Sequence, residues 1–117
     1  MTKKETALIT GATSGIGYDC AVILAERGYD LFLASRNRSA LEGIKAAFEP
    51  QYGVAVEILS VDLSKAGSAQ LVFDHGAQRD LEVAVLINNA GFGAQGAHVD
   101  LPLAAVSKKI VKSSLNI

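Results

Sequence analysis

The sequence predicts an α/β domain in which helices cover both faces of a parallel β-sheet. Short apolar segments alternate with amphipathic segments of helical period along the 117 residues. A glycine-rich turn follows the first apolar segment, and residues 83–88 have the nearly unbroken hydrophobicity of a strand buried on both faces. Because crossovers between parallel strands are right-handed, four strands separated by helices give a doubly wound sheet, for which we expect the strand order 3-2-1-4.

The first strand and the first helix flank the glycine-rich turn. Residues 6–9 are expected to form a short buried strand, and a helix begins after Ile16 and stops at Gly28. The residues at helical spacing that we expect on its buried side are Ile16, Cys20, Ile23, Leu24 and Arg27. In that position Cys20 is expected to be a structural thiol in the core and not a nucleophile.

The middle of the chain continues the alternation. Residues 30–35 are expected to form a second buried strand. A second amphipathic helix runs from Arg38 to about Phe48, and the stretch 50–53 ends it because it contains both a proline and a glycine. A third strand is expected at 54–61.

The remaining elements complete one small domain that covers residues 1–117. A helix is expected near 68–75, and the fourth strand at 83–88 follows it. A last helix is expected from about Leu103 to the end of the chain, because Val106, Ile110 and Leu115 fall roughly on one side of it. The chain has no internal repeat or linker, and its length is sufficient to bury a core.

The glycine-rich turn is a candidate phosphate-binding loop. Gly11, Gly15 and Gly17 follow the spacing G-x-x-x-G-x-G, a longer turn than the dinucleotide fingerprint G-x-G-x-x-G. A helix N-terminus exposes backbone N–H groups and attracts anions, and glycine lets a pyrophosphate approach the backbone. Thr13 adds a hydroxyl, and Ser14 can cap the helix that starts at Ile16. The turn alone fits either an ordinary tight turn or a pyrophosphate site.

The end of the second strand predicts which dinucleotide binds. Folds that bind the unphosphorylated dinucleotide place an acidic residue about 20 positions after the glycines, whereas an arginine there suits a 2′-phosphate. Here Ser35, Arg36, Asn37 and Arg38 occupy this region, with no acidic residue among them. We therefore expect NADP(H) in preference to NAD(H). The alternative is that both arginines only solvate a loop.

Polar residues also follow the third and fourth strands. Asp62, in the pair Asp62-Leu63, either accepts a hydrogen bond from an adenine amino group or caps the next helix. Asn88 and Asn89 follow a wholly apolar strand, where polar side chains need partners. They either brace neighbouring strands or face a ligand.

Composition excludes several other classes of protein. The net charge is −1, so bulk charge gives no reason to expect a nucleic-acid partner. The single cysteine cannot form an internal disulfide, which fits a reducing compartment, and no apolar stretch is long enough for a membrane span. We expect a cytoplasmic protein without a metal site.

Taken together, these motifs resemble those of the short-chain dehydrogenase/reductase family, whose cofactor domain is of the Rossmann type. The segment 10–17, Thr-Gly-Ala-Thr-Ser-Gly-Ile-Gly, is similar to the family's cofactor-binding motif, Asp62-Leu63 to its adenine-contact pair, and 88–91, Asn-Asn-Ala-Gly, to its signature after the fourth strand. The resemblance implies that the turn holds the pyrophosphate and Ser35-Arg36-Asn37 the ribose phosphate, and that Ala90 and Gly91 line the nicotinamide ribose. The cofactor contacts that the resemblance implies are Gly11, Thr13, Ser14, Gly15, Ile16, Gly17, Ser35, Arg36, Asn37, Asp62, Leu63, Asn89, Ala90 and Gly91.

The resemblance also implies which catalytic groups the chain has and lacks. In this family an asparagine on the helix after the signature holds a proton-relay water, and Asn116 falls at about the right distance. The family transfers hydride between a nicotinamide and a carbonyl or alcohol by means of a Tyr-x-x-x-Lys pair and a serine. The residues four places after the three tyrosines are Val22, Leu33 and Val56, so the pair is absent.

We therefore expect the chain to be the cofactor-binding half of such an oxidoreductase, truncated before the catalytic half and unable to turn over alone. The alternatives are an inactive nucleotide-binding module and an assembly partner of another chain. The fourth strand is apolar on both faces and should have a further parallel strand beside it. We expect no such strand in this chain, so this edge of the sheet would be unpaired and would lead to self-association.

Overall fold

A parallel sheet of five strands organises the part of the chain that the computed structural model describes, residues 5–89 and 113–116. The strand order is β3-β2-β1-β4-β5, and every neighbouring pair runs parallel. The strands are β1 (Thr6–Thr10), β2 (Asp30–Ser35), β3 (Val56–Ser60), β4 (Val83–Asn88) and β5 (Ser113–Asn116). The expected order 3-2-1-4 is confirmed for the first four strands.

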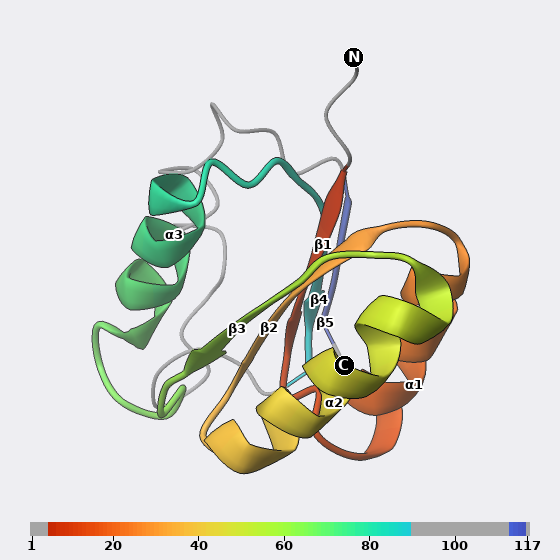
Figure 1. Ribbon diagram of the computed structural model, residues 1–117. Helices are drawn as coiled ribbons and strands as arrows, with labels where there is room; N and C mark the ends of the chain where they lie inside the picture. The colour runs from red at the N-terminus through yellow and green to blue at the C-terminus, as the bar shows by residue number, and fades with distance from the viewer. Residues whose placement is uncertain (1–4, 90–112, 117) are drawn as a thin grey trace.

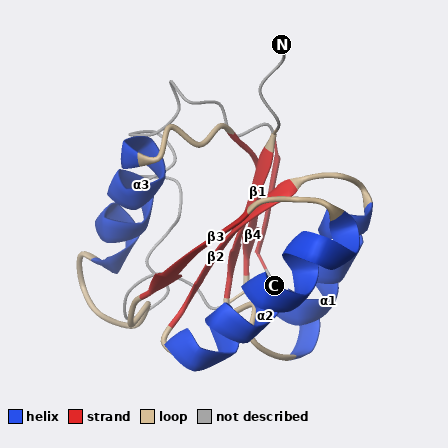
Figure 2. Ribbon diagram, viewed as in Figure 1, coloured by secondary structure: helices blue, strands red, loops and turns tan. Residues whose placement is uncertain are grey.

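Among the described residues, three helices cover the sheet on both faces. They are α1 (Gly15–Glu26), α2 (Arg38–Tyr52) and α3 (Ser68–Gln78). Figure 1 shows α1 and α2 side by side on one face of the sheet and α3 on the other. In Figure 2 the two layers of helices are blue and the strands between them are red. The arrangement is the doubly wound α/β fold that the alternating segments predicted.

The end of the second helix lies later than predicted. The helix α2 continues through Pro50 to Tyr52, and Gly53, with φ of 67°, is its C-cap. The N–H of Gly53 donates to the carbonyl of Glu49 at 3.0 Å, which closes the last turn. Pro50 has no N–H to donate to the preceding turn, and the helix ends two residues after it.

The segment 113–116 contradicts the prediction of a helix from Leu103 to the end of the chain. It is the strand β5, which pairs with β4 from Val85 to Asn88. Residues 103–112 lie outside the described part. The apolar strand β4 offers an open row of backbone donors and acceptors, and this pairing decides the structure of a short segment whose own preferences are weak. The expected unpaired edge beside β4 is therefore wrong, and the self-association expected from it loses its basis.

The core has one apolar layer on each face of the sheet. Because side chains alternate along a strand, Ile9 and Leu33 pack beneath α1 and α2, whereas Leu8 and Phe32 pack beneath α3. All four side chains are fully buried. The sheet is thus covered on both sides over its central strands.

The buried side of α1 differs from the prediction. Its buried residues are Gly17, Ala21 and Ala25, whereas Ile16 and Ile23 are 59% and 47% exposed. Small residues at a spacing of four let the helix axis approach the sheet closely, and this packing overrides the hydrophobicity of larger side chains. Cys20, which was expected in the core, is only half-buried and packs against the same core cluster.

A charged cluster joins α3 to the edge strand β3. Glu57 Oε2 lies 2.7 Å from His75 Nε2 and 3.1 Å from Arg79 Nε, and the His75 ring stacks on Phe32 with 5.4 Å between centroids. Burial alone would raise the pKa of Glu57, but the hydrogen bonds from His75 and Arg79 outweigh it and hold the pKa below its ordinary value. The carboxylate therefore stabilises the fold in its ionised form.

This lowered pKa predicts a loss of stability in acid. The unfolded chain binds a proton at Glu57 more readily than the folded chain does, so the contribution is present above the ordinary carboxyl pKa and is lost as pH falls below about 4.5. We expect Glu57→Gln to lower the free energy of unfolding by about 0.5–1 kcal/mol at pH 7, the range of a partly exposed ion pair. Denaturant titrations should show this difference shrinking toward pH 3.

The matched control is Glu42→Gln, which removes a carboxylate from an exposed pair with Arg38 on α2. Its effect at pH 7 should be smaller than that of Glu57→Gln. Equal effects of the two substitutions at every pH would contradict the role given to Glu57.

Candidate functional site

An open cleft lies at the carboxyl ends of the first three strands. It has a volume of about 390 Å³ and is formed by the loops that follow β1, β2 and β3. Its lining residues are Gly11, Thr13, Ser35, Arg36, Asn37, Val61, Asp62, Leu63 and Ser64. The doubly wound topology places these loops together, since ligands of such sheets bind at the carboxyl ends of the strands.

The glycine-rich turn brings α1 against the loop that follows β1. Gly11 and Gly15 have φ values of 68° and 63°, in the left-handed region that favours glycine. A Cβ atom on Gly17 would lie 2.3 Å from the carbonyl oxygen of Gly11 and 2.8 Å from Asn89 Nδ2. Gly11 and Gly15 are therefore needed for their backbone dihedral angles, and Gly17 is needed because a side chain would not fit.

The N-terminus of α1 has neither a side-chain cap nor an acidic residue to balance its partial positive charge. Ser14 is the N-cap residue, as expected, but its side chain makes no capping hydrogen bond, and the first turn contains no acidic residue. Backbone N–H groups at such an end combine with the helix dipole to favour an anion. This end of α1 can therefore receive a phosphate group.

The two asparagines at the end of β4 hold the turn in place. Thr10 Oγ1 donates to Asn88 Oδ1 at 3.1 Å in a buried hydrogen bond, and Asn89 Nδ2 donates to the carbonyl oxygen of Gly11 at 3.0 Å. The Gly11 N–H in turn donates to the carbonyl of Ala34 on β2 at 2.9 Å. Of the two roles left open by the sequence, the bracing of neighbouring strands is the one that these contacts support.

The loop after β2 separates the two arginines. Arg36 lines the cleft, whereas Arg38 Nε pairs with Glu42 at 3.1 Å on the surface of α2. Asn37 caps α2, because its Oδ1 accepts from the N–H of Ala40 at 3.0 Å. The sequence contained the signal for this cap, since asparagine is a favoured N-cap residue, but the role was not predicted.

The carboxylate of Asp62 stands in the cleft without capping α3. The N-cap of α3 is Gly67, so the alternative that assigned Asp62 to this cap is wrong. Asp62 Oδ1 accepts from the hydroxyl of Ser64 at 2.6 Å and from its N–H at 3.0 Å. These bonds, with the nearby charges of Arg36 and Lys65, hold the pKa of Asp62 below its usual range, so the side chain is an acceptor at neutral pH.

The remaining predicted site residues fall elsewhere. Ala90 and Gly91 lie outside the described residues. Asn116 is on β5 and has Asn88 as its backbone partner, not on a helix as predicted. Within residues 5–89 and 113–116, no group of histidine, cysteine and carboxylate side chains has the arrangement of a metal site. None of the helices described is long and apolar enough to cross a membrane.

Comparison with known proteins identifies the family. A family model described as short chain dehydrogenase matches residues 5–116, and the chain belongs to this family. The chain is 35% identical over 111 residues to a very-long-chain 3-oxoacyl-CoA reductase of Candida albicans, a match that covers 95% of this chain and 31% of the relative. The chain thus spans about a third of the length of this curated relative.

Two solved structures share the fold and differ in the cofactor that they contain. An alcohol dehydrogenase of Thermococcus sibiricus complexed with 5-hydroxy-NADP has a TM-score of 0.71 at 37% identity, covering 76% of this chain and 38% of that one. A short chain dehydrogenase/reductase of Burkholderia phymatum in complex with NAD has a TM-score of 0.68 at 31% identity, covering 76% of this chain and 31% of that one. Family membership therefore leaves the choice between the two dinucleotides open.

The close approach at Gly17 predicts a large effect of one added methyl group. In Gly17→Ala the new Cβ must displace α1 or the Gly11 loop, because the atom that it meets is backbone. We expect the free energy of unfolding to fall by about 1–3 kcal/mol, as for other overpacked sites. Thermal or denaturant unfolding would measure the change.

Gly43→Ala is the matched control, since it adds the same atom to a helix where no heavy atom lies within 4 Å. It should raise the free energy of unfolding by about 0.5–1 kcal/mol through helix propensity. A Gly17→Ala variant as stable as the wild type would show that the turn can relax, contrary to the packing described above.

Proposed function

We propose that the cleft binds NADP(H) and that this chain forms the cofactor-binding part of an oxidoreductase. The donor set fits this group: the end of α1 offers backbone N–H groups to a pyrophosphate, and Arg36 offers a guanidinium to a phosphate on the adenosine ribose. Asp62 offers an ionised acceptor, which suits the amino group of an adenine. The chemistry of the cleft thus matches the successive parts of a phosphorylated dinucleotide.

The observation that carries the preference for the phosphorylated form is the position of Arg36. It lines the cleft directly after β2, where a dinucleotide with a free ribose hydroxyl requires an acidic partner, and Ser35 and Asn37 beside it are uncharged. The acid in this cleft is Asp62, which follows β3 and lies near enough to Arg36 for the two charges to interact. A 2′-phosphate would gain charge-assisted hydrogen bonds from the guanidinium.

The reaction that we propose for the whole protein is hydride transfer between the nicotinamide and a carbonyl or alcohol substrate. When bound, the nicotinamide supplies or accepts the hydride. The groups of the cleft only bind and orient the cofactor: Gly17 and Asn89 fix the turn, and Arg36 and Asp62 hold the adenosine end. No Tyr-x-x-x-Lys pair occurs in the 117 residues, so we expect the chain to bind cofactor without turning over substrate.

Substituting each arginine in turn distinguishes a specific contact of Arg36 with the 2′-phosphate from a general effect of positive charge. We expect Arg36→Ala to weaken NADPH binding by about 10-fold to 100-fold, the loss of a charge-assisted hydrogen bond, with little change in NADH binding. Arg38→Ala removes the same charge two residues later, from a side chain paired with Glu42, and should leave both affinities nearly unchanged. Fluorescence titration with NADPH and NADH would measure both affinities for the wild type and for each of the two variants.

Two results would contradict the proposal. Tighter binding of NADH than of NADPH by the wild type would overturn the cofactor preference. Equal losses for both cofactors in Arg36→Ala would mean that the guanidinium contacts a part that the two dinucleotides share.

A further inference from the structure

The strand β3 is an edge of the sheet, and alternate residues along it turn their backbone groups away from β2. The N–H of Leu31 donates to the carbonyl of Ala55, and the N–H of Val61 donates to the carbonyl of Ser35. In this parallel register the residues of odd number face β2. Val56, Ile58 and Ser60 therefore direct their N–H and C=O groups outward, where another strand could pair with them.

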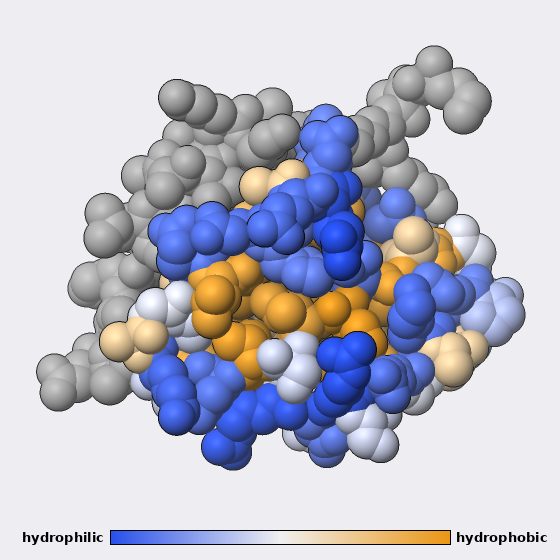
Figure 3. Space-filling model, turned by 60° about the vertical axis from the view of Figure 1, so that its left-hand side comes forward, coloured by the Kyte–Doolittle hydropathy of each residue, from blue (hydrophilic) through white to orange (hydrophobic). Residues whose placement is uncertain are grey.

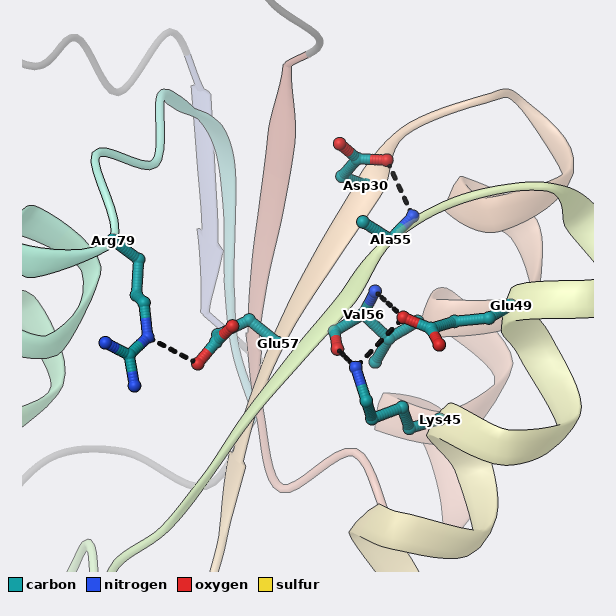
Figure 4. Close-up of polar contacts among 7 residues, drawn as sticks. All are labelled: Asp30, Lys45, Glu49, Ala55, Val56, Glu57 and Arg79. Carbon is teal, nitrogen blue, oxygen red and sulfur yellow. Dashed lines mark hydrogen bonds and ion pairs between the residues drawn. The ribbon is translucent and has the colours of Figure 1, made fainter.

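Two side chains of α2 occupy the first of these outward positions. Lys45 Nζ donates to the carbonyl oxygen of Val56 at 2.6 Å, and Glu49 Oε2 accepts from the N–H of Val56 at 3.0 Å. Lys45 and Glu49 also pair with each other at 2.9 Å, as Figure 4 shows. The Val56 N–H is the main cause that lowers the pKa of Glu49, and Lys45 adds to it, so the carboxylate stays ionised at neutral pH.

The rest of the edge has no such cover among the described residues. Within residues 5–89 and 113–116, no side chain forms a hydrogen bond to the backbone of Ile58. The hollow beside this part of the edge, between β3 and α3, includes Leu59, Val61 and Leu71 in its lining, and Leu71 is 59% exposed. Figure 3 shows apolar side chains gathered between polar rims on the side of the molecule turned forward. An edge next to apolar surface is prone to pairing.

We infer that the Lys45–Glu49 pair blocks β3 from pairing with the β3 strand of a second copy of the chain. The outward residues are symmetric about Ile58, so two antiparallel copies would place Val56 of each opposite Ser60 of the other. Most hydrogen bonds of that pairing require the N–H and C=O of Val56, which α2 has already bound. Only the central pair at Ile58 would remain, too little to hold two strands together.

The double variant K45A/E49A tests this block. We expect its sedimentation mass to move toward twice the 12.2 kDa of the chain as concentration rises, while the wild type at equal concentration does not show this change. Hydrogen exchange at the Ile58 amide should slow by about tenfold or more in the variant, because the new pairing uses that N–H.

The matched control is R38A/E42A, which removes another i,i+4 pair of α2, whose hydrogen bond joins only these two exposed side chains. It should behave as the wild type does in both measurements. Adding Ser60→Pro to K45A/E49A should restore the wild-type mass, because proline removes an outward N–H of an exposed edge residue. The backbone bonds between β3 and β2 stay, and the other bond lost is that of the Ser60 hydroxyl to the Arg36 carbonyl.

Each other outcome overturns the inference. A folded K45A/E49A variant with the mass and the Ile58 exchange rate of the wild type would show that the pair blocks nothing. Association that Ser60→Pro does not reverse would arise from another surface. If the double variant does not fold, Glu49→Ala alone, which frees the Val56 N–H, must associate more than R38A/E42A for the inference to stand. None of these measurements depends on cofactor binding, so their outcome is independent of the proposed function.

Discussion

The contact between α1 and the loop after β1 leaves no room for a side chain at Gly17, and the site depends on this contact. It fixes how close the end of α1 comes to the sheet, and the small residues Ala21 and Ala25 continue the close packing along the helix. Asn89, the residue after β4, donates to the same carbonyl oxygen of Gly11. The turn is thus held from both sides, so the backbone groups facing the cleft are in position before any ligand arrives.

The two edges of the sheet are managed in different ways. Beside β4 the chain supplies a further strand, β5, which continues the parallel ladder. Beside β3 no strand follows within the described residues, and side chains of α2 take the backbone groups of Val56 instead. The strand β5 extends the sheet, whereas the side chains of α2 end it at β3. Both form hydrogen bonds with backbone N–H and C=O groups that could otherwise pair with another chain.

The sequence predicted the order of the first four strands and the loops that form the cleft, because periodicity and crossover handedness constrain both. It did not predict which side of α1 is buried, since the tight approach of a glycine-containing helix favours alanine over isoleucine. It also placed a helix where β5 lies, because four residues of weak preference take the structure that their neighbour imposes. The roles of Asn88 and Asn89 could not be predicted, because an asparagine that braces strands and one that binds a ligand have the same sequence signal.

The hydrogen bond between Asn89 and Gly11 joins residues 78 positions apart. Closing so long a loop costs more chain entropy than closing the short connection between α2 and β3, so we expect the local units to form before this contact. On the ribosome, the glycine turn emerges first but lacks its brace until β4 has been synthesised and has docked beside β1. We therefore expect the glycine-rich turn to reach its final structure only when nearly the whole described sheet exists, although all of its glycines lie among the first seventeen residues.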